Sequence, residues 1–145
     1  MFSITFYYYF AALHAAYPRL LAREGLYESG KPLLRIRITA EVGRVEGEHI
    51  VDRVEREYTI TYGRRGKLNA IMGFAVVRAD APGGREADAE RLAAVIKALT
   101  GKEPRIRRMK SGEVIVECYR EHLDGFMQYA ELVNSIIKWL RESKQ

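Results

Sequence analysis

The chain has 145 residues, 48% of them apolar and 30% charged, which fits one folded domain and excludes an intrinsically disordered chain. Its net charge is +5, with 17 Arg and 7 Lys against 19 acidic residues, so the surface is mildly basic and rich in guanidinium groups. Cys118 is the only cysteine, which excludes an internal disulfide and a cysteine-rich metal site. Because Asn and Gln are scarce beside abundant Arg and Glu, we expect a thermophilic, intracellular origin and a cytoplasmic location.

The N-terminal segment is free of charged side chains over its first 18 residues, yet we expect no membrane span. Tyr, Ser, Thr and His interrupt the apolar run, and it is shorter than the roughly 20 residues that a spanning helix needs. A signal peptide would begin with positive charge, whereas this segment begins neutral.

Residues 2–10 alternate between two sets of aromatic and β-favouring side chains, which predicts a strand. The segment "FAALHAAYPRLLAREG", residues 10–25, then predicts a helix that is kinked at Pro18 and closed by Gly25. Ala12 and Ala16 are small residues four apart on this helix, and such spacing allows a second helix to approach closely. We therefore expect a homodimer whose interface contains these two alanines.

Three strands are expected next, over residues 33–45, 50–62 and 68–79, and the last of them is apolar on both faces, as in a central strand. We expect "GRRG", residues 63–66, to form a hairpin turn that exposes two arginines.

The second half of the chain begins with a helix over residues 85–101, which has a regular apolar stripe. A short hairpin follows, with its turn at a Lys-Ser-Gly sequence, and a helix over residues 122–143 ends the chain. Because the strands meet through short turns, the fold class is α+β, with a mainly antiparallel sheet and helices on one face. All 145 residues form a single domain, 1–145.

The residue types of catalysis are present without the spacing that catalysis needs. The three histidines lack the spacing of a metal site, and we expect no cofactor. Cys118 and His122 are four apart, but Cys118 shares a strand face with Val114 and Val116, which favours a buried thiol over a nucleophile. The acids Asp80, Glu86 and Asp88 are expected to decorate a helix start.

Two alternatives stay open beside the main interpretation. A protein-interaction or scaffold domain would dock a partner on exposed aromatics, with these candidates: Tyr7, Tyr9, Tyr119 and Trp139. An enzyme would need a pocket, for which the candidates are Tyr58, Tyr62, His49 and Asp52.

The basic residues carry the main interpretation. If helices cover one face of the sheet, arginines on the strands and turns can gather on the other face and contact phosphates first and base edges second. Cross-strand glutamates would neutralise them in a plain solvated sheet, which is the competing interpretation. We expect a non-catalytic DNA-binding protein with contacts from Arg35, Arg37, Arg64, Arg65, Lys67, Lys102, Arg105, Arg107, Arg108 and Lys110.

Two resemblances accompany this interpretation. The words "GREADAERLAAVIKALTGKEP" and "REHLDGFMQYAEL" resemble the repeat-associated paralogous protein family of Pyrobaculum-type crenarchaea, over roughly the C-terminal half. That family is uncharacterised and implies no activity.

The order of elements is similar to one half of a LAGLIDADG homing endonuclease, in which the sheet rides in the major groove. In that family the signature helix packs against its twin and ends in a metal-binding acid, whereas "FAALHAAYP" is followed here by Arg19. The resemblance implies a mobile-element origin and DNA binding, without the carboxylate that metal-assisted cleavage requires.

Overall fold

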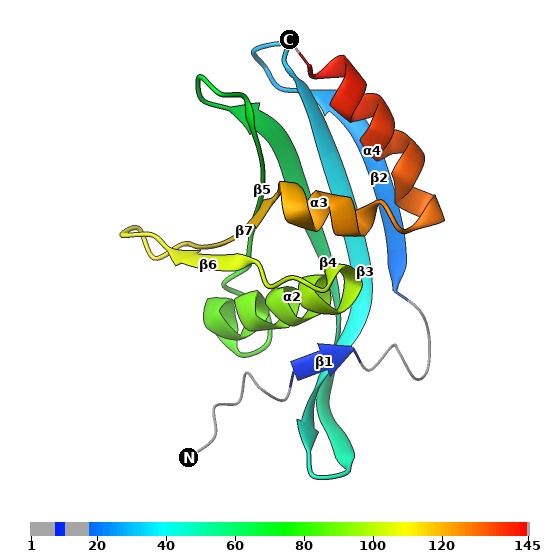
Figure 1. Cartoon of the computed structure of the whole chain (residues 1–145). Coiled ribbons are helices and arrows are strands. Elements are labelled where there is room, and N and C mark those ends of the chain that lie inside the picture. The colour runs from blue at the N-terminus through cyan, green and yellow to red at the C-terminus, as the bar shows by residue number, and fades with distance from the viewer. Residues whose placement is uncertain (1–7, 11–17, 145) are drawn as a thin grey trace.

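The computed structural model describes residues 8–10 and 18–144 (Figure 1). In chain order the elements are β1 (Tyr8–Phe10), β2 (Arg19–Leu26), β3 (Pro32–Glu46), β4 (His49–Arg65), β5 (Ala70–Val76), α2 (Gly84–Thr100), β6 (Arg105–Arg108), β7 (Val114–Tyr119), α3 (Arg120–Phe126) and α4 (Ala130–Glu142).

One antiparallel sheet organises the fold, with the strand order β1-β3-β4-β5-β7-β6 and β2 paired to β3 beside β1. The helices α2, α3 and α4 lie against the same face of this sheet (Figure 1). The predicted fold class, α+β with a mainly antiparallel sheet, is confirmed. Within the described ranges, no helix has both the length and the apolar character that crossing a membrane requires.

The core lies between the sheet and the helices because strand residues alternate between the two faces. Ile36 of β3 is opposite Ile60 of β4, and both are fully buried. From the helices, Leu92 of α2 and Trp139 of α4 pack against this surface. The opposite set of β3 side chains, which includes Arg35 and Arg37, therefore points away from the helices.

The helix predicted over residues 10–25 is wrong where the structure describes it. Residues 19–26 form β2, which pairs antiparallel with β3. Leu20 and Ala22 point into the core, while Arg19 and Arg23 are exposed on the other face. Residues 11–17, with the dimer candidates Ala12 and Ala16, lie outside the described residues. The predicted strand over 2–10 is present across β1, the described part of that range.

Two further boundaries differ from the prediction. The strand β4 continues through "GRR" to Arg65, and the turn spans residues 66–69, where Gly66 and Asn69 have positive φ angles of 72° and 52°. The predicted last helix is broken into α3 and α4. The break follows a close crossing, in which a Cβ on Gly125 would lie 2.8 Å from Thr100 Cα at the end of α2.

Candidate nucleic-acid interface

The sheet has an outer face, which we define as the strand side chains turned away from α2, α3 and α4. Cross-strand register places one continuous row of these side chains across six strands, which we call the central row: Arg23, Arg35, Thr61, Phe74, Glu117 and Arg105. Neighbouring strands are about 4.8 Å apart, so the row is about 24 Å long.

The β2–β3 end of the row is basic. Arg23 and Arg35 are direct cross-strand partners, and both are exposed. Neither forms an ion pair with any described residue, although like charges placed opposite each other destabilise a sheet. Nearby, Arg37 pairs with Glu57 at 3.7 Å, a long contact between two side chains that are more than half exposed. Such a pair contributes little and leaves its arginine able to meet another anion.

The middle of the row carries an aromatic group. The guanidinium of Arg65 lies over the ring of Phe74, 4.4 Å from its centroid, and Phe74 is only partly buried. On either side of Phe74 along β5, Met72 and Val76 also point to the outer face, and Val76 is 59% exposed. The outer face thus combines a stacked cation with exposed apolar surface.

The β7–β6 end holds one buried carboxylate. Glu117 is 1% exposed and accepts hydrogen bonds from Arg107 Nη1 at 2.7 Å and from the Tyr119 hydroxyl at 3.0 Å. The Nε of Arg105 lies 3.9 Å from the same carboxylate. Two guanidinium groups share this one acid, so the three side chains together are net positive and the carboxylate of Glu117 is already occupied.

Five of the ten predicted contact residues lie on the outer face: Arg35, Arg37, Arg65, Arg105 and Arg107. Three lysines lie at the turns and loops between elements and are exposed there: Lys67, Lys102 and Lys110.

Two predicted residues point to the helix side instead. Arg64 donates to Ser143 Oγ at 2.9 Å and to the Leu140 carbonyl at 3.3 Å, and its guanidinium lies over Trp139. Arg108 forms an ion pair of 2.6 Å with Glu86 of α2. Side chains alternate between the two faces of a strand, so Arg64 and Arg65 cannot both face outward. The prediction that both are exposed assumed a turn at residues 63–66, where the structure has a strand.

Sequence reasoning missed Arg19, Arg23 and Phe74 as outer-face residues. The signal for the arginines was present, because "RLLAR" alternates polar and apolar positions as a strand does. For Phe74 there was no such signal, since its exposure depends on which strand lies beside β5 and on what covers the sheet.

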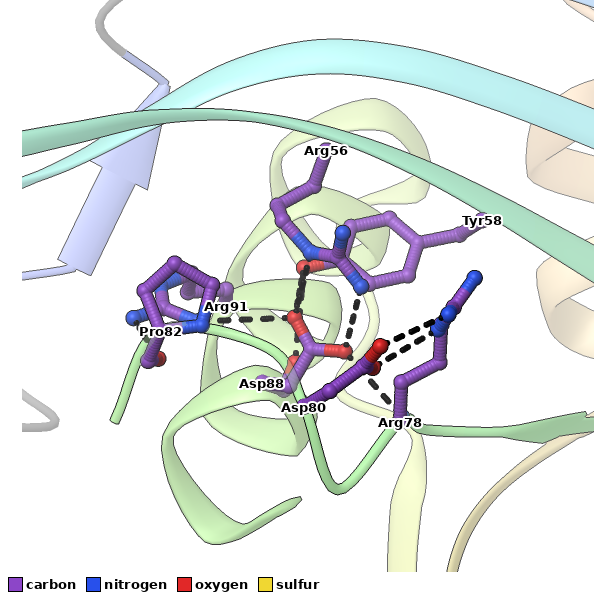
Figure 2. A network of polar contacts seen from close by, with 7 residues as sticks. All are labelled: Arg56, Tyr58, Arg78, Asp80, Pro82, Asp88 and Arg91. Carbon is purple, nitrogen blue, oxygen red and sulfur yellow. Dashed lines mark hydrogen bonds and ion pairs between the residues drawn. The ribbon is translucent and has the colours of Figure 1, made fainter. Parts of the chain in front are cut away.

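A buried polar network centred on Asp88 lies on the helix side of the sheet (Figure 2). Arg56 of β4 binds both oxygens of Asp88, at 2.8 and 3.0 Å, and the Tyr58 hydroxyl donates to it at 2.9 Å. Arg91 reaches the same carboxylate at 3.4 Å and also donates to the Pro82 carbonyl. Asp88, expected to decorate a helix start, does lie near the start of α2, but it is fully buried and binds side chains of β4.

The network sets the protonation of its members. Burial acts to raise the pKa of Asp88, but the hydrogen bonds from Arg56 and Tyr58 outweigh it and hold that pKa below its ordinary value. Burial, with the neighbouring carboxylate, raises the pKa of Tyr58 far above its ordinary value. Asp88 is fully buried and saturated with donors, so it clamps α2 to β4 and offers no carboxylate to a substrate.

The Cys–His pair considered above does not form a nucleophile. Cys118 is fully buried, and burial raises the pKa of its thiol to about 12. His122 Nδ1 accepts a hydrogen bond from the Tyr119 backbone N–H at 2.8 Å, and its Nε2 lies 3.0 Å from the Glu103 carbonyl. Both ring nitrogens are thus engaged by backbone groups, which orient the start of α3.

The other enzyme candidates do not converge. Tyr58 and Tyr62 are buried among core residues, whereas His49 and Asp52 are exposed near the tip of the β3–β4 hairpin. A pocket of about 430 Å³ lies between the β2–β3 and β4–β5 turns, lined by Tyr27, Ser29, Gly30, Lys31, Pro32, Arg64, Asn69 and Ser143. None of the four enzyme candidates lines this pocket, whose titratable side chains are Tyr27, Lys31 and Arg64.

Aromatic docking and metal binding find little support in the described residues. Trp139 is fully buried, so the predicted exposure of its indole is wrong, and Tyr119 is partly buried against Glu117. Tyr7 lies outside the described residues. No group of three or more His, Cys, Asp or Glu within the described ranges could hold a metal ion.

Comparisons with protein-family models, with curated proteins and with solved structures found no match to this chain.

Proposed function

We propose that the protein is a non-catalytic nucleic-acid-binding protein, acting on DNA, with the outer face of its sheet as the binding surface. One observation carries the proposal: Arg23, Arg35 and Arg65 project from three strands of that face with no carboxylate partner among the described residues. Guanidinium groups left without acids are suited to phosphate oxygens.

The rest of the outer face supports the same conclusion. Its glutamates are outnumbered by arginines, and Glu117 is covered by Arg105 and Arg107. Further ion pairs on this face are long and partly to well exposed: Arg19–Glu55 at 3.6 Å, Arg37–Glu57 at 3.7 Å and Arg53–Glu41 at 3.6 Å. A polyanion can displace such acids at small cost because exposed pairs are weak.

The proposal extends to three expectations from the sequence. These are a mobile-element origin with a LAGLIDADG-like layout, a homodimer formed through the segment that contains Ala12 and Ala16, and a cytoplasmic location. The sedimentation coefficient of the protein with and without Ala12→Leu tests the dimer, because a larger side chain would hinder close packing of this segment against its copy.

The test of binding is fluorescence anisotropy with labelled single- and double-stranded oligonucleotides at about 50 and about 200 mM salt. We expect binding at the lower salt and a loss of about tenfold or more at the higher. Arg23→Ala/Arg35→Ala should weaken binding at both concentrations.

The matched control is Arg120→Ala/Arg141→Ala, which removes the same charge from exposed positions on α3 and α4. If binding responds equally to both double variants, the outer face is not the site. If no oligonucleotide binds at low salt, the proposed function is wrong.

A further inference from the structure

Phe74 is placed where a phosphate-binding surface has no need of an aromatic ring. It occupies the centre of the central row, between Thr61 of β4 and Glu117 of β7, and is only partly buried. A ring buried on the helix side would contribute more hydrophobic stabilisation than the partly exposed ring of Phe74 does on the outer face.

The Arg65–Phe74 pair is already arranged as a stack. The guanidinium carbon of Arg65 lies over the ring, 4.4 Å from its centroid, and Arg65 is itself exposed. Unpaired bases stack on aromatic rings and on arginine planes alike, and each such contact is tolerant of base identity. This pair therefore offers the kind of surface that receives the face of a base.

Phosphate-binding groups flank this stack along the row. Arg23 and Arg35 lie on one side of Phe74, and Arg105 with Arg107 lies on the other. A nucleic-acid strand laid across the sheet would meet cations first, then a stacking surface, then cations again. The about 24 Å length of the row suits a site of about four nucleotides.

A duplex does not complement this arrangement. In a duplex the bases expose only their edges, in a major groove about 12 Å wide, and their faces are covered by stacking. The central row is about twice as wide as that groove and has its aromatic group in the middle. The base faces that Phe74 and Arg65 can contact exist only in unpaired strands.

We infer that the outer face binds single-stranded nucleic acid, with at least one unpaired base stacked on the Arg65–Phe74 pair and the backbone phosphates held by the flanking arginines. This inference rests on the proposed function and names its substrate class.

The experiment compares an oligothymidylate and an oligouridylate of about 12 nucleotides with the corresponding duplexes. We expect either single strand to bind about tenfold or more tightly than duplex, and Phe74→Leu to weaken single-strand binding roughly 5- to 100-fold. The matched control is Ile137→Ala, which trims an exposed apolar side chain on α4, away from the outer face, and should leave affinity unchanged. Circular dichroism and thermal unfolding confirm that each variant is folded.

The outcomes separate the two proposals. Binding of duplex as tight as that of single strand, or a Phe74→Leu affinity equal to wild type while Arg23→Ala/Arg35→Ala weakens binding, overturns the single-strand inference and keeps the proposed function. Absence of binding to every oligonucleotide overturns both.

Discussion

At the scale of single residues, Arg23 and Arg35 show how the proposed binding surface would conflict with stability. They are cross-strand partners with the same charge and no acid among the described residues to separate them. Like charges directly opposite each other cost a sheet up to about 1 kcal/mol, so some reason other than folding is needed to retain both. The proposed phosphate binding would supply that reason.

We predict that Arg23→Gln raises the free energy of unfolding by about 0.2–1 kcal/mol, measured by urea denaturation, because the repulsion with Arg35 is relieved. Arg120→Gln is the contrasting variant, since Arg120 forms a 2.9 Å ion pair with Asp124 one turn along α3. Its loss should lower stability by about 0.3–0.5 kcal/mol. Changes of the same sign in the two variants would contradict this account of the arginine pair.

The lowered pKa of Asp88 predicts that the protein becomes less stable in acid. Its folded pKa is below the unfolded value of about 3.9, because the Arg56 and Tyr58 hydrogen bonds outweigh the cost of burial. A carboxyl group whose pKa is lowered by folding stabilises the protein fully when the pH is above the pKa of the unfolded state. This stabilisation is lost as the pH falls through the pKa of the folded state. We expect unfolding free energy to decline below about pH 4, by up to about 1.4 kcal/mol per pH unit from this group.

Substitution of Asp88 can show whether this residue causes the loss of stability in acid. Asp88→Asn should remove most of the pH dependence of the unfolding free energy below about pH 4. It should also lower that free energy by about 3 kcal/mol at neutral pH, since Arg56 would be left without its partner. The control is Asp80→Asn, whose carboxylate pairs with Arg78 on the surface, where both side chains are about two thirds exposed. If the unfolding free energies of the two variants fall equally as the pH is lowered, Asp88 does not account for the pH dependence.

At the scale of elements, the crossing of α3 over the end of α2 depends on Gly125. A Cβ there would lie 2.6 Å from Thr100 Cβ and 2.8 Å from Thr100 Cα, and the backbone of α2 cannot move aside as a side chain can. Gly125→Ala should therefore destabilise the protein by about 1–3 kcal/mol, although alanine favours a helix over glycine by about 1 kcal/mol.

Thermal unfolding measures this effect, and Asn134→Ala, at an exposed position within α4, is the control for added helix propensity. An unchanged or raised melting temperature for Gly125→Ala would mean that the two helices do not cross as closely as described.

The elements that the sequence predicted correctly are those whose local pattern and tertiary role agree. The alternation of Ile36 and Ile38 with Arg35 and Arg37 identified β3, and the stripe of α2 identified that helix. The segment 19–26 failed because Leu and Ala favour a helix locally, while the edge of β3 needed a hydrogen-bonding partner. Tertiary pairing overrode local propensity there.

At the scale of the whole molecule, the central row could not have been predicted from the sequence. The chain places β7 between β5 and β6, so Glu117 becomes the neighbour of Phe74, more than forty positions away in the numbering. Patterns within a strand identify which side chains share its face, but they do not identify the neighbouring strand. The gathering of arginines was predicted in outline, and its aromatic centre was not.

The charge of the outer face predicts how strongly affinity depends on salt concentration, and this dependence distinguishes phosphate contacts from stacking. Each phosphate neutralised on a single strand contributes about −0.7 to the slope of log affinity against log salt. Arg23, Arg35 and Arg65 carry free charges, and Arg105 with Arg107 exceeds Glu117 by one charge. The expected slope for wild type is therefore about −2 to −3.

The two kinds of variant should then differ in slope as well as in affinity. Arg23→Ala/Arg35→Ala should reduce the magnitude of the slope by about 1.4, because two phosphate contacts are lost. Phe74→Leu should lower affinity at every salt concentration and leave the slope unchanged, because stacking releases no counterions. Anisotropy titrations over at least four salt concentrations, about 50 to about 200 mM, measure both quantities. Equal slopes for wild type and the double-arginine variant would show that these guanidinium groups meet no phosphate, whatever the affinity.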